Sequence, residues 1–266
     1  MLRLDSADGG GVAARLLMLN ATAYYASIML QVAGLVLTMV ALATTSSDVP
    51  GVIVYLLCLD LAVQIIEAAF YSTAVLVLGS AAAVADRLYL RFGDWLLSVP
   101  VMAATLYQYA VYRADRCTVT KAPDVFRPVD ILVLIVLVLF VWTMLFVGWL
   151  YEFPGEAAQR LDSTLGGREG IGQLWAWLSL LVVFVPPLVV VAQSGDGLSW
   201  LVLVYTAVCW ACYGLAALAW RGAGAIDVLK RNTAYSVLDV CSKQTLGIIF
   251  SIAALNWGDG DACGGR

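Results

Sequence analysis

Long apolar runs separated by short polar stretches are the main pattern of the chain. Three of these runs, residues 131–151, 171–195 and 197–220, contain no Asp, Glu, Lys or Arg. A helix rises about 1.5 Å per residue, so each run is long enough to cross a hydrocarbon core of roughly 30 Å. The whole pattern predicts seven membrane-spanning helices, at residues 17–45, 51–80, 89–112, 129–152, 170–194, 198–220 and 232–256.

The stretches between the predicted helices carry turn-forming and charged residues. Pro50 and Pro128 stand where predicted helices begin, and the first turn of a helix tolerates proline. The first apolar run is too long for the core of a signal peptide, so we expect it to be retained as a helix. We therefore predict an all-α fold, a seven-transmembrane-helix bundle that forms a single membrane domain over residues 1–266.

Composition supports the same class of protein. The AVILMFWYC set makes up 62% of the chain and charged residues only 13%, and the mean hydropathy is +0.89. A soluble domain carries about 25% charged residues, so the chain is expected to be an integral, multi-pass protein of a lipid bilayer. The formal net charge of −4 argues against a nucleic-acid partner.

Cysteine and histidine content gives no indication of a metal site. The chain has six cysteines and no histidine. Cys209 and Cys212 have the spacing of a zinc or redox pair, but there is no second pair, so we predict that they pack as small apolar residues. No arrangement of residues indicates an enzyme.

Six ionisable residues lie inside the predicted helices, where each costs about 2.5–3.5 kcal/mol at the helix centre. They are Asp60, Glu67, Arg91, Asp94, Asp239 and Lys243. Such residues usually face the interior of a bundle and mark function. For Asp60 and Arg91 the alternative is a position near the interface, from which the side chain reaches water. Lys243 has apolar sequence on both sides for several turns, so this alternative does not apply to it.

Lys243 follows Asp239 by four residues, so both side chains share one face of a helix. One interpretation is a structural ion pair, in which each charge offsets part of the other's burial cost. The other is a covalent carrier, because a desolvated lysine amine is the usual residue for forming a Schiff base with an aldehyde.

Three segments together resemble the microbial (type I) rhodopsins. Residues 91–100, RFGDWLLSVP, are similar to the family's R-Y-x-D-W-L-x-T-x-P signature. Residues 238–243, LDVCSK, are similar to its L-D-x-x-x-K retinal-lysine motif, and residues 210–213, WACY, to the W-x-x-Y pattern of the retinal pocket. The resemblance extends over the whole chain.

This resemblance implies that all-trans-retinal lies in the bundle core and is bound to Lys243 as a protonated Schiff base. It implies that Asp94 is the primary counterion and proton acceptor and that Asp239 is a second counterion. Arg91 would pair with these carboxylates and act as a gate. The retinal pocket that it implies consists of Trp95, Ser98, Met102, Trp210 and Tyr213, with Trp175 and Pro100 as weaker candidates. Tyr213 is also expected to form a hydrogen bond toward Asp239.

Two of the departures from the family pattern bear on the photocycle or on the shape of a helix, whereas Ser98 in place of the common threonine is a mild one. Thr105 stands where the family's pumps generally have a carboxylate that returns a proton to the Schiff base. A hydroxyl cannot donate that proton at ordinary pH, so the photocycle should be slow. Gly214 replaces the proline that usually follows the pocket tyrosine, which leaves the bend of the sixth helix open.

A stripe of polar residues follows one face of the second predicted helix. Asp60, Gln64, Glu67 and Tyr71 recur at i, i+4, i+7 and i+11. The segment looks like the second helix of viral and algal rhodopsins, including the rhodopsin modules fused to bestrophin channels. The stripe favours a water-filled ion path; the alternatives are a subunit interface, or polar residues whose hydrogen bonds are satisfied inside the bundle.

The first predicted helix carries a similar stripe, made of Asn20, Tyr24, Ser27 and Gln31. Two such stripes favour a hydrated path or a polar interface between the first two helices. Glu67 itself is expected to lie outside the group formed by Asp94, Asp239 and Lys243.

Three functions are compatible with these features. The first couples light-driven isomerisation of retinal to the translocation of an ion, expected to be a proton, by a pump with slow reprotonation or a light-gated cation channel. The second is a photosensory rhodopsin that signals to, or gates, a partner channel or fused module. The third, a transporter or receptor without retinal, is disfavoured by the combined motifs. A homo-oligomer is expected.

Overall fold

The computed structural model describes residues 7–45, 47, 49–75, 81–116, 118–152, 169–220 and 225–255. These residues form seven long helices: α1 (Ala7–Thr44), α2 (Gly51–Val75), α3 (Ala81–Ala114), α4 (Pro128–Glu152), α6 (Glu169–Ser194), α7 (Gly197–Ala219) and α8 (Ala225–Leu255). A short 3₁₀ helix, η1 (Ala122–Val125), precedes α4. The prediction of an all-α, seven-helix fold is confirmed.

Three helices begin earlier than the apolar pattern predicted. α1 begins at Ala7 rather than at residue 17, α3 at Ala81 rather than at 89, and α8 at Ala225 rather than at 232. The apolar signal marks the part of a helix that lies in hydrocarbon, whereas good helix formers such as the alanines that open α3 extend it further. Residues 76–80 and 256, which the pattern assigned to helices, lie outside the described residues.

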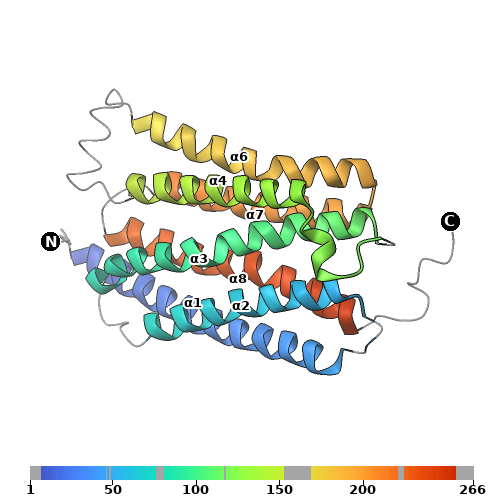
Figure 1. Ribbon diagram of the computed structural model, residues 1–266. Coiled ribbons are helices and arrows are strands. Elements are labelled where there is room, and N and C mark those ends of the chain that lie inside the picture. Colours follow the sequence, from blue (N-terminus) through green and yellow to red (C-terminus); the bar gives the residue numbers. More distant parts are fainter. Residues whose placement is uncertain are drawn as a thin grey trace.

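α3 and α8 occupy the middle of the bundle (Figure 1). α8 packs along α1 and also contacts α2, α3 and α7, while α3 contacts α2, α4 and α6. α1 and α2 cover one side, and α4, α6 and α7 the other. In the apolar span of α8 50% of the residues are buried, against 17% in α4. The two helices with the charged motifs are therefore enclosed by the others.

Six of the described helices, all except α3, are long and apolar enough to span a membrane. α3 has 34 residues, but buried polar groups such as Arg91, Asp94 and Gln108 lower its hydropathy. Leu181 and Leu201 point outward and are 63% and 66% exposed. Lipid tails are as apolar as leucine, so such a surface is stable in a bilayer. The protein is an integral, multi-pass membrane protein.

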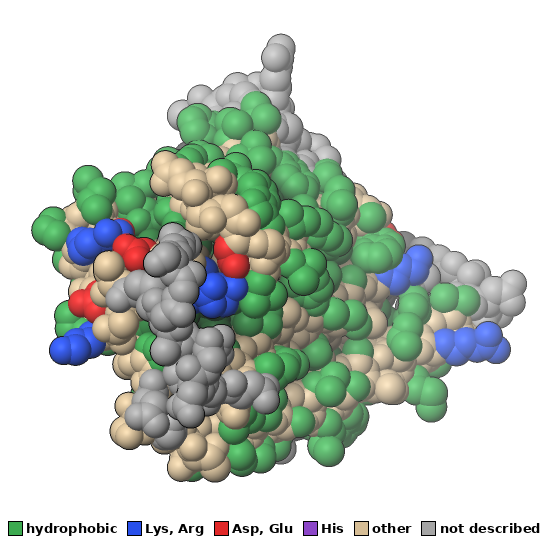
Figure 2. Space-filling model, turned by 90° about the vertical axis from the view of Figure 1, so that its right-hand side faces the viewer, with side chains coloured by type: hydrophobic (Ala, Val, Ile, Leu, Met, Phe, Trp, Pro, Cys, Tyr) green, Lys and Arg blue, Asp and Glu red, His purple; other side chains and the backbone are tan. Residues whose placement is uncertain are grey.

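An ion pair joins α3 to the start of α7 at one end of the bundle, the end that faces the viewer in Figure 2. Arg113, in the last turn of α3, donates to both carboxylate oxygens of Asp196, at 3.0 and 2.6 Å. Asp196 caps α7 by accepting from the backbone N–H and the hydroxyl of Ser199, at 2.9 and 2.6 Å. Burial acts to raise the pKa of Asp196, but Arg113 and Ser199 outweigh burial and hold that pKa below its usual range. Gly195, just before it, has a φ of +64°, which residues with a Cβ rarely adopt.

Candidate functional site

The charged residues of α2, α3 and α8 meet in the interior of the bundle. Glu67, Arg91 and Asp239 have no exposed surface, and Asp94 and Lys243 are 6% and 2% exposed. None of them reaches water along its side chain, so the interface position considered for Arg91 is wrong. Burial of this many charges requires that they compensate one another.

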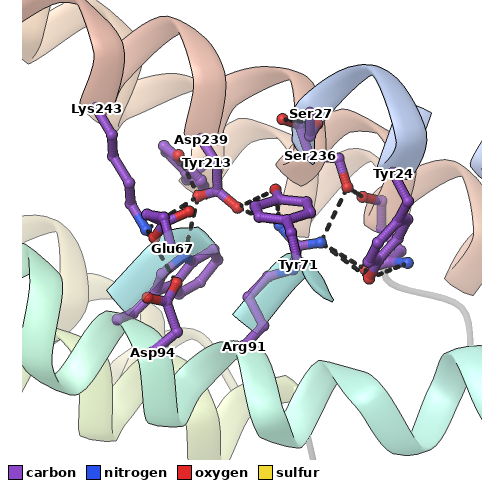
Figure 3. A network of polar contacts seen from close by, with 12 residues as sticks. Tyr24, Ser27, Glu67, Tyr71, Arg91, Asp94, Tyr213, Ser236, Asp239 and Lys243 are labelled. Atoms are coloured by element: carbon purple, nitrogen blue, oxygen red, sulfur yellow. Dashed lines mark hydrogen bonds and ion pairs between the residues drawn. The ribbon is translucent and has the colours of Figure 1, made fainter. Parts of the chain in front are cut away.

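Three carboxylates surround the amine of Lys243 (Figure 3). Its Nζ donates to Glu67 Oε1, lies 3.0 Å from Asp94 Oδ2 and lies 3.6 Å from Asp239 Oδ1. The expectation that Glu67 lies outside this group is therefore wrong. Helical periodicity groups residues on one face of α2, but it does not say toward which neighbour that face turns, and here it turns toward α8.

Asp239 is held by donors from three helices. It accepts hydrogen bonds from Tyr71 on α2 at 2.7 Å, from Tyr213 on α7 at 2.8 Å and from Trp95 on α3 at 3.0 Å. It also forms an ion pair with Arg91. So many donors stabilise the ionised form of a carboxylate and fix its position.

Arg91 joins the carboxylates to a second polar group at the α1–α8 contact. Its guanidinium donates to Tyr24 at 3.0 Å, Asn232 at 3.2 Å and Ser236 at 3.0 Å. The guanidinium also lies over the ring of Phe70, 5.3 Å from the centroid. These contacts give partners to both terminal nitrogens of the buried guanidinium, which a single carboxylate on one of them would not.

An apolar pocket lies on the other side of Lys243, between α3, α4, α6, α7 and α8. Its lining residues include Phe92, Trp95, Met102, Trp177, Trp210, Tyr213, Tyr235 and Lys243. The pocket has a volume of about 130 Å³, counted as the space open to the centre of a water molecule. A single water occupies roughly 10–15 Å³ when counted in the same way, so the pocket admits a much larger apolar molecule.

Three expected pocket residues lie elsewhere. Trp175 is 54% exposed, and the indole that lines the pocket is that of Trp177. A step of two residues turns a helix by roughly 200°, so the two indoles face opposite sides. Ser98 and Pro100 are buried on α3 but do not line the pocket. Gly214 does line it, and a Cβ there would lie 2.7 Å from the Trp177 ring, so the glycine makes room for that indole.

Glutamine side chains continue the polar network beyond Glu67. We call Gln31, Gln64 and Gln244 the amide cluster. Gln31 donates to Glu67 Oε2 at 3.3 Å, and Gln244 donates to Gln64 at 2.5 Å and also to Gln31. All three are buried, and they come from α1, α2 and α8.

Asp60 lies one helical turn before Gln64, is 4% exposed and accepts a hydrogen bond from Thr38 at 3.1 Å. Its carboxylate lies directly against the backbone of α8 at Gly247, where a Cβ would collide with it. The interface position considered for Asp60 is therefore also wrong.

At its other end the network continues along α1 and α8. Asn20 donates to Thr233 at 3.0 Å, and Asn232 donates to Tyr24 at 3.0 Å. From Asn20 to Thr38 the polar residues on α1 are spread over 18 residue-to-residue steps, which is about 27 Å of helix. We call this set, from Asn20 through Arg91, Lys243 and the amide cluster to Asp60, the polar column.

The burial of the polar column excludes one of the three explanations of the stripe on α2. Gln64, Glu67 and Tyr71 have no exposed surface, and their partners belong to the same chain. The subunit-interface interpretation is therefore wrong, which leaves the ion path and internal packing.

Thr105 is buried on α3, and its hydroxyl donates to the Val101 carbonyl of its own helix at 2.7 Å. Among the described residues no group of His, Cys, Asp or Glu side chains has an arrangement that could hold a metal ion.

Asn232 and Ser236 were missed by the sequence analysis. With Asp239 and Lys243 they recur at i, i+4, i+7 and i+11, the same spacing that marked the stripe on α2. The helical spacing could therefore have identified Asn232 and Ser236, although neither residue is ionisable. Gln244 carried no such signal, because its partners come from other helices.

Comparisons with known proteins show the family and the fold of the chain. A family model described as bacteriorhodopsin-like protein matches residues 19–257. Among solved structures the chain is similar to viral rhodopsin OLPVRII, with a TM-score of 0.69, 19% identity, and coverage of 90% of this chain and 100% of that chain. It is also similar to xanthorhodopsin, described as a light-driven ion pump with dual chromophore, with a TM-score of 0.66, 14% identity and coverage of 90% and 93%. A third similar structure is the light-driven proton pump of Coccomyxa subellipsoidea, with a TM-score of 0.61 and 18% identity. The match covers 88% of this chain and 96% of that chain.

A search of curated proteins found no match. At these identities, the solved structures establish the shared fold alone.

Proposed function

The chain belongs to the bacteriorhodopsin-like family, and from this premise we propose that it binds retinal through Lys243 and translocates protons when it absorbs light. Family membership supports the coarser statement, a retinal-binding light-driven ion transporter or sensor. The observation that carries the finer proposal is the polar column, because the buried amine of Lys243 lies within it, at the border of the aromatic pocket. Proton movement at that amine is thereby linked to a chain of polar groups.

The residues of the pocket fit retinal. A polyene needs an apolar, largely aromatic enclosure, and Trp95, Trp210 and Tyr213 supply one beside a buried primary amine. Retinal supplies the absorption of light and the isomerisation that follows. Trp95 and Tyr213 line the pocket and also donate to Asp239, so a change of shape in the pocket acts on that carboxylate through two hydrogen bonds.

The carboxylates hold and then receive the proton of the Lys243 nitrogen. In the dark, their negative charge stabilises a positive charge on Nζ, which burial alone would disfavour. Asp239 remains an anion throughout, since Arg91, Tyr71, Tyr213 and Trp95 all donate to it. The proton therefore moves from Nζ to one of the other two carboxylates.

Return of a proton to Lys243 cannot use Thr105, because its hydroxyl is not an acid at ordinary pH. We assign this task to Asp60, the buried carboxyl group that lies beyond the amide cluster. The distance from Asp60 to Lys243 requires several hydrogen-bonded steps, so the return should be slow.

Light-induced pH change in liposomes of known orientation tests the proposal. After addition of all-trans-retinal the protein should show a visible band that hydroxylamine removes under light, and illumination should change the internal pH. A protonophore should abolish that change. A current that persists against the proton gradient identifies a pump, and one that reverses with the gradient identifies a channel. If no visible band forms, the proposal is wrong.

Thr105 also favours a second function, a photosensory rhodopsin. A slow return of the proton keeps the light-activated form populated for longer, which suits signalling to a partner better than rapid transport. A visible band and a slow photocycle without any pH change or current would favour this function over translocation.

A further inference from the structure

Glu67 is a third carboxylate in contact with the amine of Lys243, beside the two expected counterions. Lys243 Nζ donates to Glu67 Oε1 and, at 3.0 Å, to Asp94 Oδ2, and it lies 3.6 Å from Asp239 Oδ1. Glu67 approaches from α2, and the two aspartates approach from α3 and α8 (Figure 3). The position of Glu67 opposite the amine is therefore an additional feature of the site.

The charges of the site do not balance if all its groups are ionised. Three carboxylates, of Glu67, Asp94 and Asp239, face two cations, Lys243 and Arg91. An uncompensated charge in a buried site is expensive, so one carboxylate should hold a proton. Asp239 is excluded as the holder by its four donors, which leaves Glu67 and Asp94 to share one negative charge.

The distribution of donors places that charge on Glu67. Both of its oxygens receive an N–H donor, Oε1 from Lys243 and Oε2 from Gln31 at 3.3 Å. Asp94 receives an N–H donor on Oδ2, from Lys243, and among the described residues none on Oδ1. A carboxylate with N–H donors on both oxygens is stabilised more in its charged form than one with a donor on a single oxygen.

We propose that Glu67 carries the negative charge opposite the Lys243 nitrogen in the dark and accepts the proton of that nitrogen after light absorption. In this step an N–H bond breaks at Nζ, an O–H bond forms at Glu67 Oε1, and the electron pair of the N–H bond stays on nitrogen. Asp94 stands beside this pair and holds a proton in the dark. The proposal rests on the proposed attachment of retinal at Lys243.

Proton transfer to Glu67 has a consequence along the polar column. A neutral carboxyl group is a weaker acceptor than a carboxylate, so the hydrogen bond from Gln31 weakens. Gln31 is itself the acceptor of a bond from Gln244, which also donates to Gln64. Glu67 therefore connects the event at Lys243 to the amide cluster, which neither Asp94 nor Asp239 contacts through a hydrogen bond among the described residues.

Two isosteric variants separate the roles of the carboxylates. With retinal bound, Glu67→Gln should shift the absorption maximum to longer wavelength more than Asp94→Asn does. Loss of the proton from the Lys243 nitrogen should slow more than tenfold in Glu67→Gln and stay within about threefold of the parent in Asp94→Asn. The reverse order for the two variants would overturn the proposal.

Asp60→Asn is the matched control for the absorption maximum alone, because Asp60 is the assigned donor for the return of the proton and its variant is expected to slow that later step. It removes a second buried carboxylate from α2, two helical turns from Glu67, and Asp60 has no contact with Lys243 in the structure. It should leave the absorption maximum of the parent in place. A shift as large as that of Glu67→Gln would show that the spectrum reports any charge on α2, which would overturn the proposal.

A double-mutant cycle in the retinal-free protein provides a readout that needs no light. Glu67→Gln and Lys243→Met should each lower the thermal midpoint. The drop in the double variant should be smaller than the sum of the two single drops, because either substitution alone already breaks the Glu67–Lys243 ion pair. Additive losses would overturn direct pairing. If Glu67→Gln does not fold, Glu67→Asp replaces it, because it keeps the negative charge. Its absorption maximum should stay within a few nanometres of that of the parent. A large shift to longer wavelength in Glu67→Asp would overturn the proposal.

Failure of this inference differs from failure of the proposed function. If the parent protein forms no visible band with retinal, the attachment at Lys243 is wrong. If the band forms and Glu67→Gln neither shifts it nor slows proton loss, only the role of Glu67 is wrong.

Discussion

A buried lysine amine is costly, so removing it tests its role without harming insertion. Lys243 is 2% exposed and lies inside α8. Lys243→Ala removes an intramembrane charge and should still insert in the membrane, but it should bind no retinal covalently and show no visible band. The visible spectrum after addition of all-trans-retinal checks this, with insertion followed by the yield of membrane-extracted protein. A retained red-shifted band would contradict the assignment of Lys243.

Thr105 offers the second test at the scale of one residue. Its hydroxyl donates to the carbonyl of Val101 and lies in a buried part of α3. A carboxyl group there would add an internal proton donor, so Thr105→Glu should speed the return of the proton to Lys243 by about tenfold or more. Flash spectroscopy at several pH values measures the rate, which in the parent should fall as bulk pH rises. A parent rate that is fast and independent of pH would contradict the slow return of the proton from Asp60.

At the scale of the helix, the sequence predicts faces but not neighbours. The spacing of Asp60, Gln64, Glu67 and Tyr71 placed them on one face, as the structure has them. The rotation of that face toward α8 depends on packing between helices distant in sequence, and this is why Glu67 was expected outside the charged group. Trp175 and Trp177 show the same limit: the family resemblance implied Trp175 as a pocket candidate, whereas the structure turns Trp177 inward and leaves Trp175 exposed.

Because α2 and α8 lie close together at Gly247, we expect that a larger residue at this position destabilises the protein. A Cβ at this position would collide with the carboxylate of Asp60, which is buried and unable to move into water. Gly247→Ala should therefore destabilise the protein by about 1–3 kcal/mol, as overpacking of a buried site does. The thermal midpoint in detergent measures the effect.

Gly93→Ala is the matched control for this prediction. Gly93 is also inside a helix, but nothing lies within 4 Å of an added Cβ. Alanine there should stabilise the helix by about 0.5–1 kcal/mol, because glycine is the worse helix former. Equal thermal midpoints for the two variants would contradict the close contact between Gly247 and Asp60.

At the scale of the whole molecule, apolar run length was sufficient to predict seven helices, because a bilayer demands spans of about 20 residues. The match to the family over residues 19–257 confirms the resemblance, which rested on the motifs at Arg91, Trp210 and Lys243. The starts of α1, α3 and α8 were placed late, since the apolar signal ends where hydrocarbon ends. The polar column was only partly visible, because Gln244 acquires its role from side chains on α1 and α2.

The ion pair between Arg113 on α3 and Asp196 at the start of α7 predicts how the stability of the whole bundle responds to acid. The pKa of Asp196 is held below its usual range, so its contribution to stability is present above the unfolded value of about 3.9 and is lost as pH falls through the folded pKa. Asp196→Ala removes the helix cap together with the partner of Arg113 and should cost about 1–2 kcal/mol at pH 7. Asp196→Asn keeps a capping oxygen and should cost less. The difference in thermal midpoint between parent and Asp196→Asn should shrink as the pH is lowered below about 4, since protonation removes the same charge from the parent. A difference that stays constant between neutral and acidic pH would show that the charge of Asp196 does not stabilise the bundle.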